Sequence, residues 1–70
     1  FKTRLQEETQ GRGLGVPHYE LVSADGPAHA RRFTMAIHLS GEKLAEGVSG
    51  TKKEAEQLAA RQALEMLKEA

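Results

Sequence analysis

The sequence contains no cysteine and no tryptophan, and its aromatic residues are one tyrosine and two phenylalanines. Without cysteine, neither a disulfide framework nor a thiolate-bound metal site can form. No apolar run approaches the roughly 18 residues that a membrane-spanning helix needs, and no signal-peptide pattern opens the chain. We therefore expect a cytoplasmic protein that has no membrane partner.

The sequence also lacks an excess of either charge: 10 Lys and Arg residues balance 10 Asp and Glu residues. A nucleic-acid-binding protein usually has a basic balance, so the total counts mildly against that class. The distribution is uneven, because residues 26–41 include no acid but contain His29, Arg31, Arg32 and His38. The position of the charges is therefore more informative than their sum.

A chain of 70 residues forms one small domain, near the lower limit of what a single core can stabilise. Residues 1–10 predict a helix with Phe1, Leu5 and Thr9 along its buried side. Gln6 and Gln10 form an uncharged polar stripe beside it, and Thr3 lies one turn before Gln6. This helix starts at the first residue without a visible cap, which suggests that the domain, residues 1–70, is a fragment of a longer protein.

The middle of the chain predicts three strands joined by tight turns. In the loop at 11–17, Leu14 is expected to enter the core, and Tyr19 to Ala24 form a strand with Tyr19 and Leu21 on one face. Asp25-Gly26-Pro27 and Gly41-Glu42 are turns. Along residues 32–40, larger apolar side chains occupy every second position. This spacing places on one face of a strand Phe33, Met35, Ile37 and Leu39. With a third strand at 43–48, an antiparallel sheet with one solvent-exposed face results.

The stretch from Ser49 to Ala55 leads into a second helix, Lys52 to about Lys68. Thr51 is the predicted N-cap, and Glu54 can reach back to it as a capping box. The helix is rich in alanine, and small residues on its buried side would let it pack closely on the sheet. Its last turns are predicted to carry Ala63, Met66 and Leu67 on one face. The fold class is therefore α+β, in the order α-β-β-β-α, with both helices on one face of the sheet.

Two adjacent lysines, Lys52 and Lys53, occupy the first turn of this helix, where the helix dipole disfavours cations. Free N–H groups and two ammonium groups would together bind phosphate. No catalytic or metal-binding constellation accompanies them. The three histidines are far apart, and the glycines at 11, 13 and 15 lack the spacing and context of a dinucleotide site. The chain is therefore interpreted as non-catalytic.

Four separated stretches carry a family resemblance: residues 2–7 with Gln10, residues 17–19, residues 26–29 with Phe33, and residues 52–57 with Ala59 and Ala60. In this order they resemble a double-stranded RNA-binding domain along nearly the whole chain. The T-x-L-Q-E-x-x-Q opening and the K-K-E-A-E-Q run are most similar to the C-terminal domain of bacterial ribonuclease III.

The resemblance implies a site made of three elements. Thr3, Gln6, Glu7 and Gln10 would meet one minor groove of the RNA, and the turn containing Gly26, Pro27 and His29 would enter the next. Thr51, Lys52 and Lys53 would hold phosphates across the major groove between them. No cofactor is expected in this domain, whereas a divalent metal, expected to be magnesium, and any oligomerisation would belong to an absent catalytic domain.

The sequence departs from the family pattern near the lysines. Members usually have glycine where Ser49 stands, often a basic residue where Gly50 stands, and in many cases another where Glu56 stands. We therefore expect weak, salt-sensitive binding with a log–log salt slope of about −3. The neutral charge and short basic cluster also leave an alternative, in which the same fold is a protein-interaction or dimerisation module.

Overall fold

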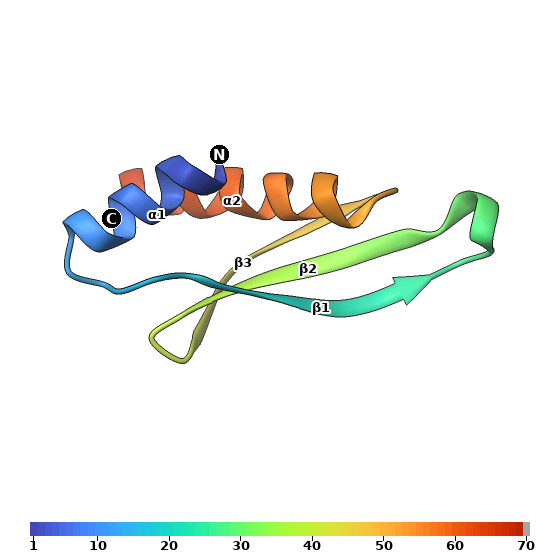
Figure 1. Ribbon diagram of the computed structural model, residues 1–70, viewed down its shortest axis with the longest axis horizontal. Helices are drawn as coiled ribbons and strands as arrows, with labels where there is room; N and C mark the ends of the chain where they lie inside the picture. The colour runs from blue at the N-terminus through green and yellow to red at the C-terminus, as the bar shows by residue number, and fades with distance from the viewer. Residues whose placement is uncertain (70) are drawn as a thin grey trace.

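A computed structural model describes residues 1–69 and shows two helices on one face of a three-stranded antiparallel sheet (Figure 1). The elements follow in the order α1 (Lys2–Gly11), β1 (His18–Asp25), the short 3₁₀ helix η1 (Ala28–Ala30), β2 (Arg32–Leu39), β3 (Glu42–Ser49) and α2 (Lys52–Glu69). The strands lie in sequence order, β1-β2-β3. The predicted fold class is confirmed. No helix within the described residues is long and apolar enough to cross a membrane.

The sheet presents one row of apolar residues to the helices. Tyr19 lies opposite Ile37, which lies opposite Ala45, and Ile37 is fully buried. Leu21 lies opposite the buried Met35, in the same register as Tyr19 opposite Ile37, so it shares the predicted face. It is nevertheless 42% exposed, because β1 is an edge strand and α2 packs on β2 and β3.

The β2–β3 hairpin turns through Ser40 and Gly41, one residue earlier than predicted. Both residues have positive φ, 54° and 82° respectively, as a tight two-residue hairpin turn requires. The hydroxyl of Ser40 donates a hydrogen bond of 3.2 Å to the carbonyl of Leu14 and so ties the preceding loop to the hairpin. Leu14 itself is 37% exposed, so the prediction that it enters the core is wrong.

Close packing between α2 and β3 depends on small residues. Ala55, Ala59, Ala60 and Ala63 are all fully buried. A Cβ atom built on Gly47 of β3 would lie 2.3 Å from the carbonyl oxygen of Ala55 and 2.5 Å from the backbone nitrogen of Ala59. Gly47 therefore allows the backbone of α2 to approach the sheet more closely than any side chain would permit.

Helix α1 packs against α2 through a narrower stripe than predicted. Leu5 and Thr9 are fully buried, but Phe1 is 57% exposed because it precedes the first helical residue. Met66, predicted to share a face with Ala63 and Leu67, is 49% exposed. The buried side of α2 follows strict i, i+4 spacing through Ala59, Ala63 and Leu67, and Met66 lies beside that line.

Candidate nucleic-acid interface

The first predicted element lies on α1. Thr3, Gln6, Glu7 and Gln10 are all exposed, on the side of the helix away from the buried Leu5 and Thr9. The Thr9 hydroxyl donates to the carbonyl of Gln6 at 3.1 Å, which satisfies the buried hydroxyl within the helix. Neither glutamine side chain has a hydrogen-bond partner within residues 1–69. The four side chains therefore present polar groups to solvent.

The second element is the turn between β1 and β2, which has a defined shape. Gly26 has a φ of +95°, and a Cβ at this position would lie 2.9 Å from the carbonyl oxygen of Ala30. Pro27 precedes η1, and its carbonyl accepts a hydrogen bond of 2.9 Å from the N–H of Ala30. Arg31 donates from Nε to the carbonyl of Gly26 at 3.4 Å. His29 is held exposed on this short helix.

The third element is the start of α2. The N–H of Glu54 donates to the hydroxyl oxygen of Thr51 at 3.1 Å, which confirms Thr51 as the N-cap. The carboxylate of Glu54 accepts a hydrogen bond of 2.8 Å from the Ser49 hydroxyl instead of completing a capping box. Because Ser49 ends β3, this bond joins the end of the strand to the first turn of the helix.

The two lysines of this turn have different surroundings. The Nζ atom of Lys52 lies 5.8 Å from the centroid of the half-buried Phe33 ring. Such cation–π contacts contribute about 0.5–1 kcal/mol at exposed sites. Lys53 is exposed, and neither lysine forms an ion pair with another described residue. Phe33 thus restrains one ammonium group beside the helix start, while the other extends into solvent.

A cluster of Lys2, Tyr19 and Glu56 connects α1, β1 and α2. The Nζ atom of Lys2 lies 2.9 Å from Oε1 of Glu56 and 4.9 Å from the centroid of the Tyr19 ring. Burial raises the pKa of the Tyr19 hydroxyl above its ordinary value, and the negative charge of Glu56 raises it further. That hydroxyl is buried without a hydrogen-bond partner in the described part of the chain. Glu56 therefore neutralises Lys2 and fixes α1 relative to α2.

The three elements are spread along the molecule and do not converge on a cavity. The molecule measures 40 × 20 × 18 Å, and in Figure 1 the start of α2 lies between α1 and the β1–β2 turn along the longest axis. No group of three or more His, Asp or Glu side chains within residues 1–69 is arranged to hold a metal ion. An extended, polar surface of this kind suits a long ligand with repeating features.

Comparison with known proteins decides the family. Residues 1–67 match the family described as the double-stranded RNA binding motif. The chain belongs to this family. Among curated relatives, ribonuclease 3 of Campylobacter jejuni is 51% identical over 67 residues, which is 96% of this chain and 30% of the relative. Ribonuclease 3 of Syntrophotalea carbinolica is 49% identical over 69 residues, 99% of this chain and 30% of the relative.

Solved structures of other double-stranded RNA-binding domains have the same fold. The first such domain of the protein HYL1 superimposes with a TM-score of 0.81 at 38% identity, covering 99% of this chain and 97% of that chain. The second domain of DRB4 gives a TM-score of 0.75 at 34% identity, covering 99% of this chain and 96% of that chain. The chain spans about 30% of the length of the first ribonuclease 3 relatives that it matches.

Two features of this RNA-binding motif were missed from the sequence. Arg31 donates a hydrogen bond that braces the Gly26 turn, and its sequence signal is the run without acids from residue 26 to 41. The pairing of Lys2 with Glu56 joins residues 54 positions apart. No local pattern could have indicated this contact.

Proposed function

We propose that this chain binds double-stranded RNA by shape, contacting two successive minor grooves and the major-groove phosphates between them. The family match over residues 1–67 carries this proposal, and the three exposed elements along the 40 Å axis support it. A-form RNA offers a wide minor groove lined with 2′-hydroxyl groups, whereas its major groove is too deep and narrow for side chains to read. Domains of this family span about 16 base pairs.

Each element has a distinct role in this proposal. Thr3, Gln6, Glu7 and Gln10 form hydrogen bonds with 2′-hydroxyls and base edges in one minor groove. The hydroxyl of Thr3 and the amides of the two glutamines both donate and accept, whereas the carboxylate of Glu7 accepts. The turn enters the next minor groove, where His29 and exposed backbone groups meet the sugars. Its shape depends on Gly26, whose positive φ and proximity to Ala30 exclude a side chain.

Lys52 and Lys53 hold the phosphates between the two minor grooves. Their ammonium groups stand beside the free N–H groups of the first turn of α2, whose positive dipole end also attracts anions. The Thr51 cap holds that turn in helical geometry. An anionic ligand thus offsets the electrostatic cost of two cations at a helix N-terminus.

The chain is further proposed to act as the RNA-binding part of a ribonuclease III-like endoribonuclease. The ribonuclease 3 relatives share about half of their residues with this chain over the matched region. Cleavage, the divalent metal that supports it, expected to be magnesium, and any oligomerisation would then belong to a separate catalytic domain. Binding of RNA by this domain should accordingly persist in EDTA.

The experiment is a titration of three nucleic acids at low salt: a duplex RNA of about 20 base pairs, the duplex DNA of the same sequence, and the single-stranded RNA. We expect clear preference for duplex RNA and a log–log salt slope of about −3. Equal affinity for duplex RNA and duplex DNA would refute recognition of A-form shape. The alternative from the sequence, a protein-interaction or dimerisation module, predicts instead no preference for duplex RNA.

Substitution separates the phosphate contacts from the groove contacts. Lys52→Ala with Lys53→Ala should abolish measurable binding while changing the melting temperature by less than about 8 °C, because only the Phe33 contact is lost. A matched control, Lys43→Ala with Arg61→Ala, removes the same charge outside the three elements and should retain binding. His29→Ala should weaken binding less and preserve the salt slope. Unfolding of the double lysine variant would show that these lysines are structural.

A further inference from the structure

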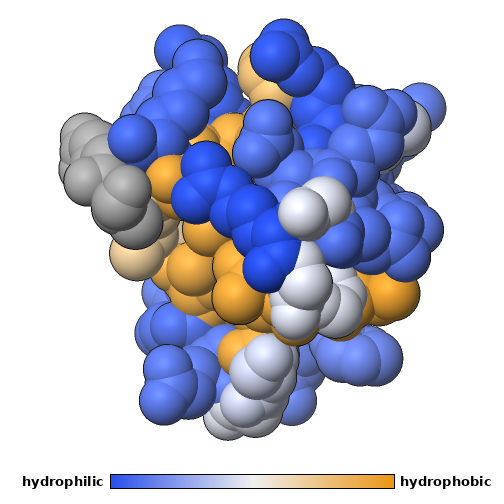
Figure 2. Space-filling view, turned by 90° about the vertical axis from the view of Figure 1, so that its left-hand side faces the viewer, coloured by the Kyte–Doolittle hydropathy of each residue, from blue (hydrophilic) through white to orange (hydrophobic). Residues whose placement is uncertain are grey.

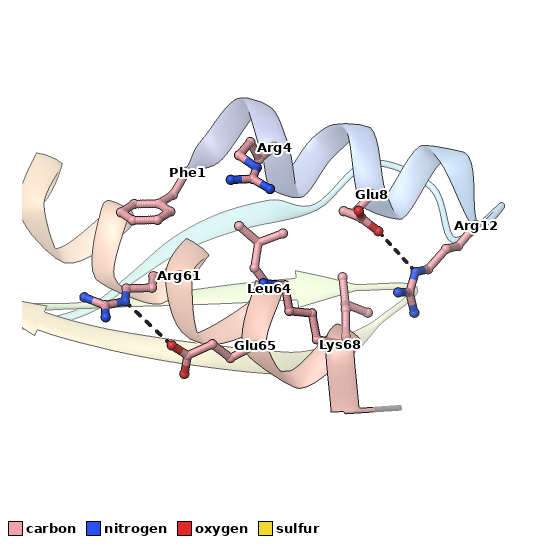
Figure 3. A pocket seen from close by; sticks show the side chains of 9 residues that line it. Phe1, Arg4, Glu8, Arg12, Arg61, Leu64, Glu65 and Lys68 are labelled. Carbon is pink, nitrogen blue, oxygen red and sulfur yellow. Dashed lines mark hydrogen bonds and ion pairs between the residues drawn. The ribbon is translucent and has the colours of Figure 1, made fainter.

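A groove between α1 and the second half of α2 has no role in the proposed RNA contacts. It encloses about 190 Å³. Figure 3 shows that side chains from both helices face into it, with Leu64 on α2 opposite Arg4 of α1 and Phe1, which precedes α1. Phe1, Leu64 and Leu67 supply its apolar surface. An exposed phenylalanine at the edge of an apolar groove is the kind of feature that marks an interaction surface.

The groove lies on the opposite side of α1 from Gln6 and Gln10, whereas Glu7 lies beside Arg4 and Glu8. Arg4, Glu8 and Arg12 line it at i, i+4 spacing, whereas Gln6 and Gln10 follow the other side of the helix. RNA bound along the glutamine stripe would therefore leave the groove accessible. We therefore expect that RNA and a ligand in the groove can bind at the same time.

The charges of the groove are arranged along each helix and not across the gap. Arg12 Nε lies 3.4 Å from Glu8 Oε2 on α1, and Arg61 Nε lies 3.6 Å from Glu65 Oε1 on α2 (Figure 3). Each glutamate is thus neutralised by its own helix. Arg4 and Lys68 also line the groove and form no ion pair with another described residue, so the groove has a positive balance.

The apolar surface continues beyond this groove around one end of the molecule. Leu67 also lines a second, shallower cavity of about 240 Å³, together with Leu14, Leu39 and Leu44. Figure 2, which looks at the end of the molecule where α1 and α2 both finish, shows hydrophobic surface surrounded by hydrophilic side chains. The exposed Leu14 thus extends the apolar surface that Leu67 begins.

We propose that this groove binds an acidic peptide segment of a partner protein that carries one bulky apolar side chain. The apolar side chain lies between Phe1 and Leu64, and carboxylates on either side of it meet Arg4 and Lys68. Charge complementarity identifies the partner, because both acids of the groove pair with an arginine while Arg4 and Lys68 form no ion pair with another described residue. The apolar floor favours a peptide over a nucleic acid, whose backbone offers no comparable side chain. The proposal does not depend on RNA binding.

The test uses a short fluorescein-labelled peptide of glutamates around a central phenylalanine, measured by fluorescence anisotropy and by ¹⁵N NMR shifts of the whole chain at low salt. We expect binding with shifts at Arg4, Leu64 and Lys68. Replacing the peptide's phenylalanine with alanine should weaken binding about tenfold, as should Arg4→Gln with Lys68→Gln in the protein. Phe1→Ser removes the apolar wall at an exposed position and should have a similar effect without unfolding the domain.

Two controls separate this groove from the RNA site. Lys53→Ala should leave peptide binding unchanged, and a saturating duplex RNA should not displace the peptide. Arg4→Gln with Lys68→Gln should change RNA affinity less than about twofold. The proposal is overturned if the shifts cluster at Lys52 and Lys53, if RNA displaces the peptide, if the alanine peptide binds equally well, or if no binding is detected.

Discussion

Replacing Gly47 with alanine should strongly destabilise the domain, because this glycine determines how closely α2 approaches the sheet. The added Cβ would lie 2.3 Å from the carbonyl oxygen of Ala55 and 2.5 Å from the nitrogen of Ala59. Both atoms belong to the backbone of a helix whose neighbouring side chains are fully buried. No side chain can rotate away to relieve these contacts, so the helix axis itself must move.

The magnitude follows from the packing. Overpacking of a core by one methylene group typically costs about 1–3 kcal/mol, and two backbone clashes place Gly47→Ala at the upper end, about 3 kcal/mol. A domain of this length has an unfolding free energy of about 4–10 kcal/mol. For a small domain, each kcal/mol lowers the melting temperature by about 4–8 °C, so we expect a decrease of at least about 12 °C.

Urea and thermal unfolding followed by circular dichroism measure this effect. Gly11→Ala and Gly50→Ala are matched controls, because an added Cβ at either position meets no atom within 4 Å. Gly11 lies at the end of α1, where alanine should be neutral or stabilising by up to about 1 kcal/mol. A melting temperature for Gly47→Ala within a few degrees of the unmodified chain would refute the proposed close approach of α2.

Three further experiments test contacts around the site. Tyr19→Phe removes a buried hydroxyl that has no partner within residues 1–69 and should raise the unfolding free energy by about 1 kcal/mol. Because the folded-state pKa of Tyr19 is raised above 10.0, the unfolded state loses this proton first, so the unmodified domain loses stability above that pH and the difference from Tyr19→Phe should widen. Lys2→Met and Glu56→Gln in a double-mutant cycle should show a coupling of about 0.5 kcal/mol in urea unfolding, and strict additivity would argue against the ion pair. Thr51→Ala should lower stability by about 1 kcal/mol through loss of the N-cap, and an unchanged urea midpoint would contradict this.

The elements of the fold could be predicted because their signals are local. Alternation in β2 identified Met35, Ile37 and Leu39 as inward-facing, and all three are buried. Thr51 before two lysines indicated the start of α2, and the helix begins at Lys52. The alternation of side chains along a strand and the capping of a helix start both depend only on residues that are neighbours in the sequence.

Errors arose where tertiary contacts override local periodicity. Leu21 has the spacing of an inward-facing residue and lies opposite Met35, but it is exposed because α2 packs on β2 and β3 and β1 is the edge strand. Gly47 looks like an unremarkable strand glycine until α2 is placed on it. Phe1 has the right spacing from Leu5 but precedes the helix, so its side chain does not follow the buried stripe. The environment of each of these residues is set by a neighbouring helix or strand, and the local sequence pattern contains no information about that neighbour.

The candidate site, too, was predictable in its local parts but not in the arrangement of those parts. Its three elements are short segments whose residue types identify them, and the structure places all of them on exposed surface. Their mutual arrangement depends on contacts between distant residues, above all the buried cluster that joins Leu5 of α1 to the sheet and to the alanines of α2. The Lys2–Glu56 pair and the contact of Lys52 with Phe33 add to it. Residue types could therefore indicate what the domain binds, but the spacing that would suit two minor grooves required the fold.

The neutral total charge is reconciled with RNA binding by where the ion pairs form. Lys2, Arg12, Lys43 and Arg61 are each paired with a glutamate. Lys52 and Lys53 at the start of α2 form no ion pair with another described residue, nor do Arg31 and Arg32 at the β1–β2 turn. Because exposed charges beyond about 10 Å are largely screened at 0.1 M salt, a phosphate responds to these nearby cations and not to the total. A small number of available cations then implies a shallow salt dependence, and shape must supply the rest of the selectivity for duplex RNA.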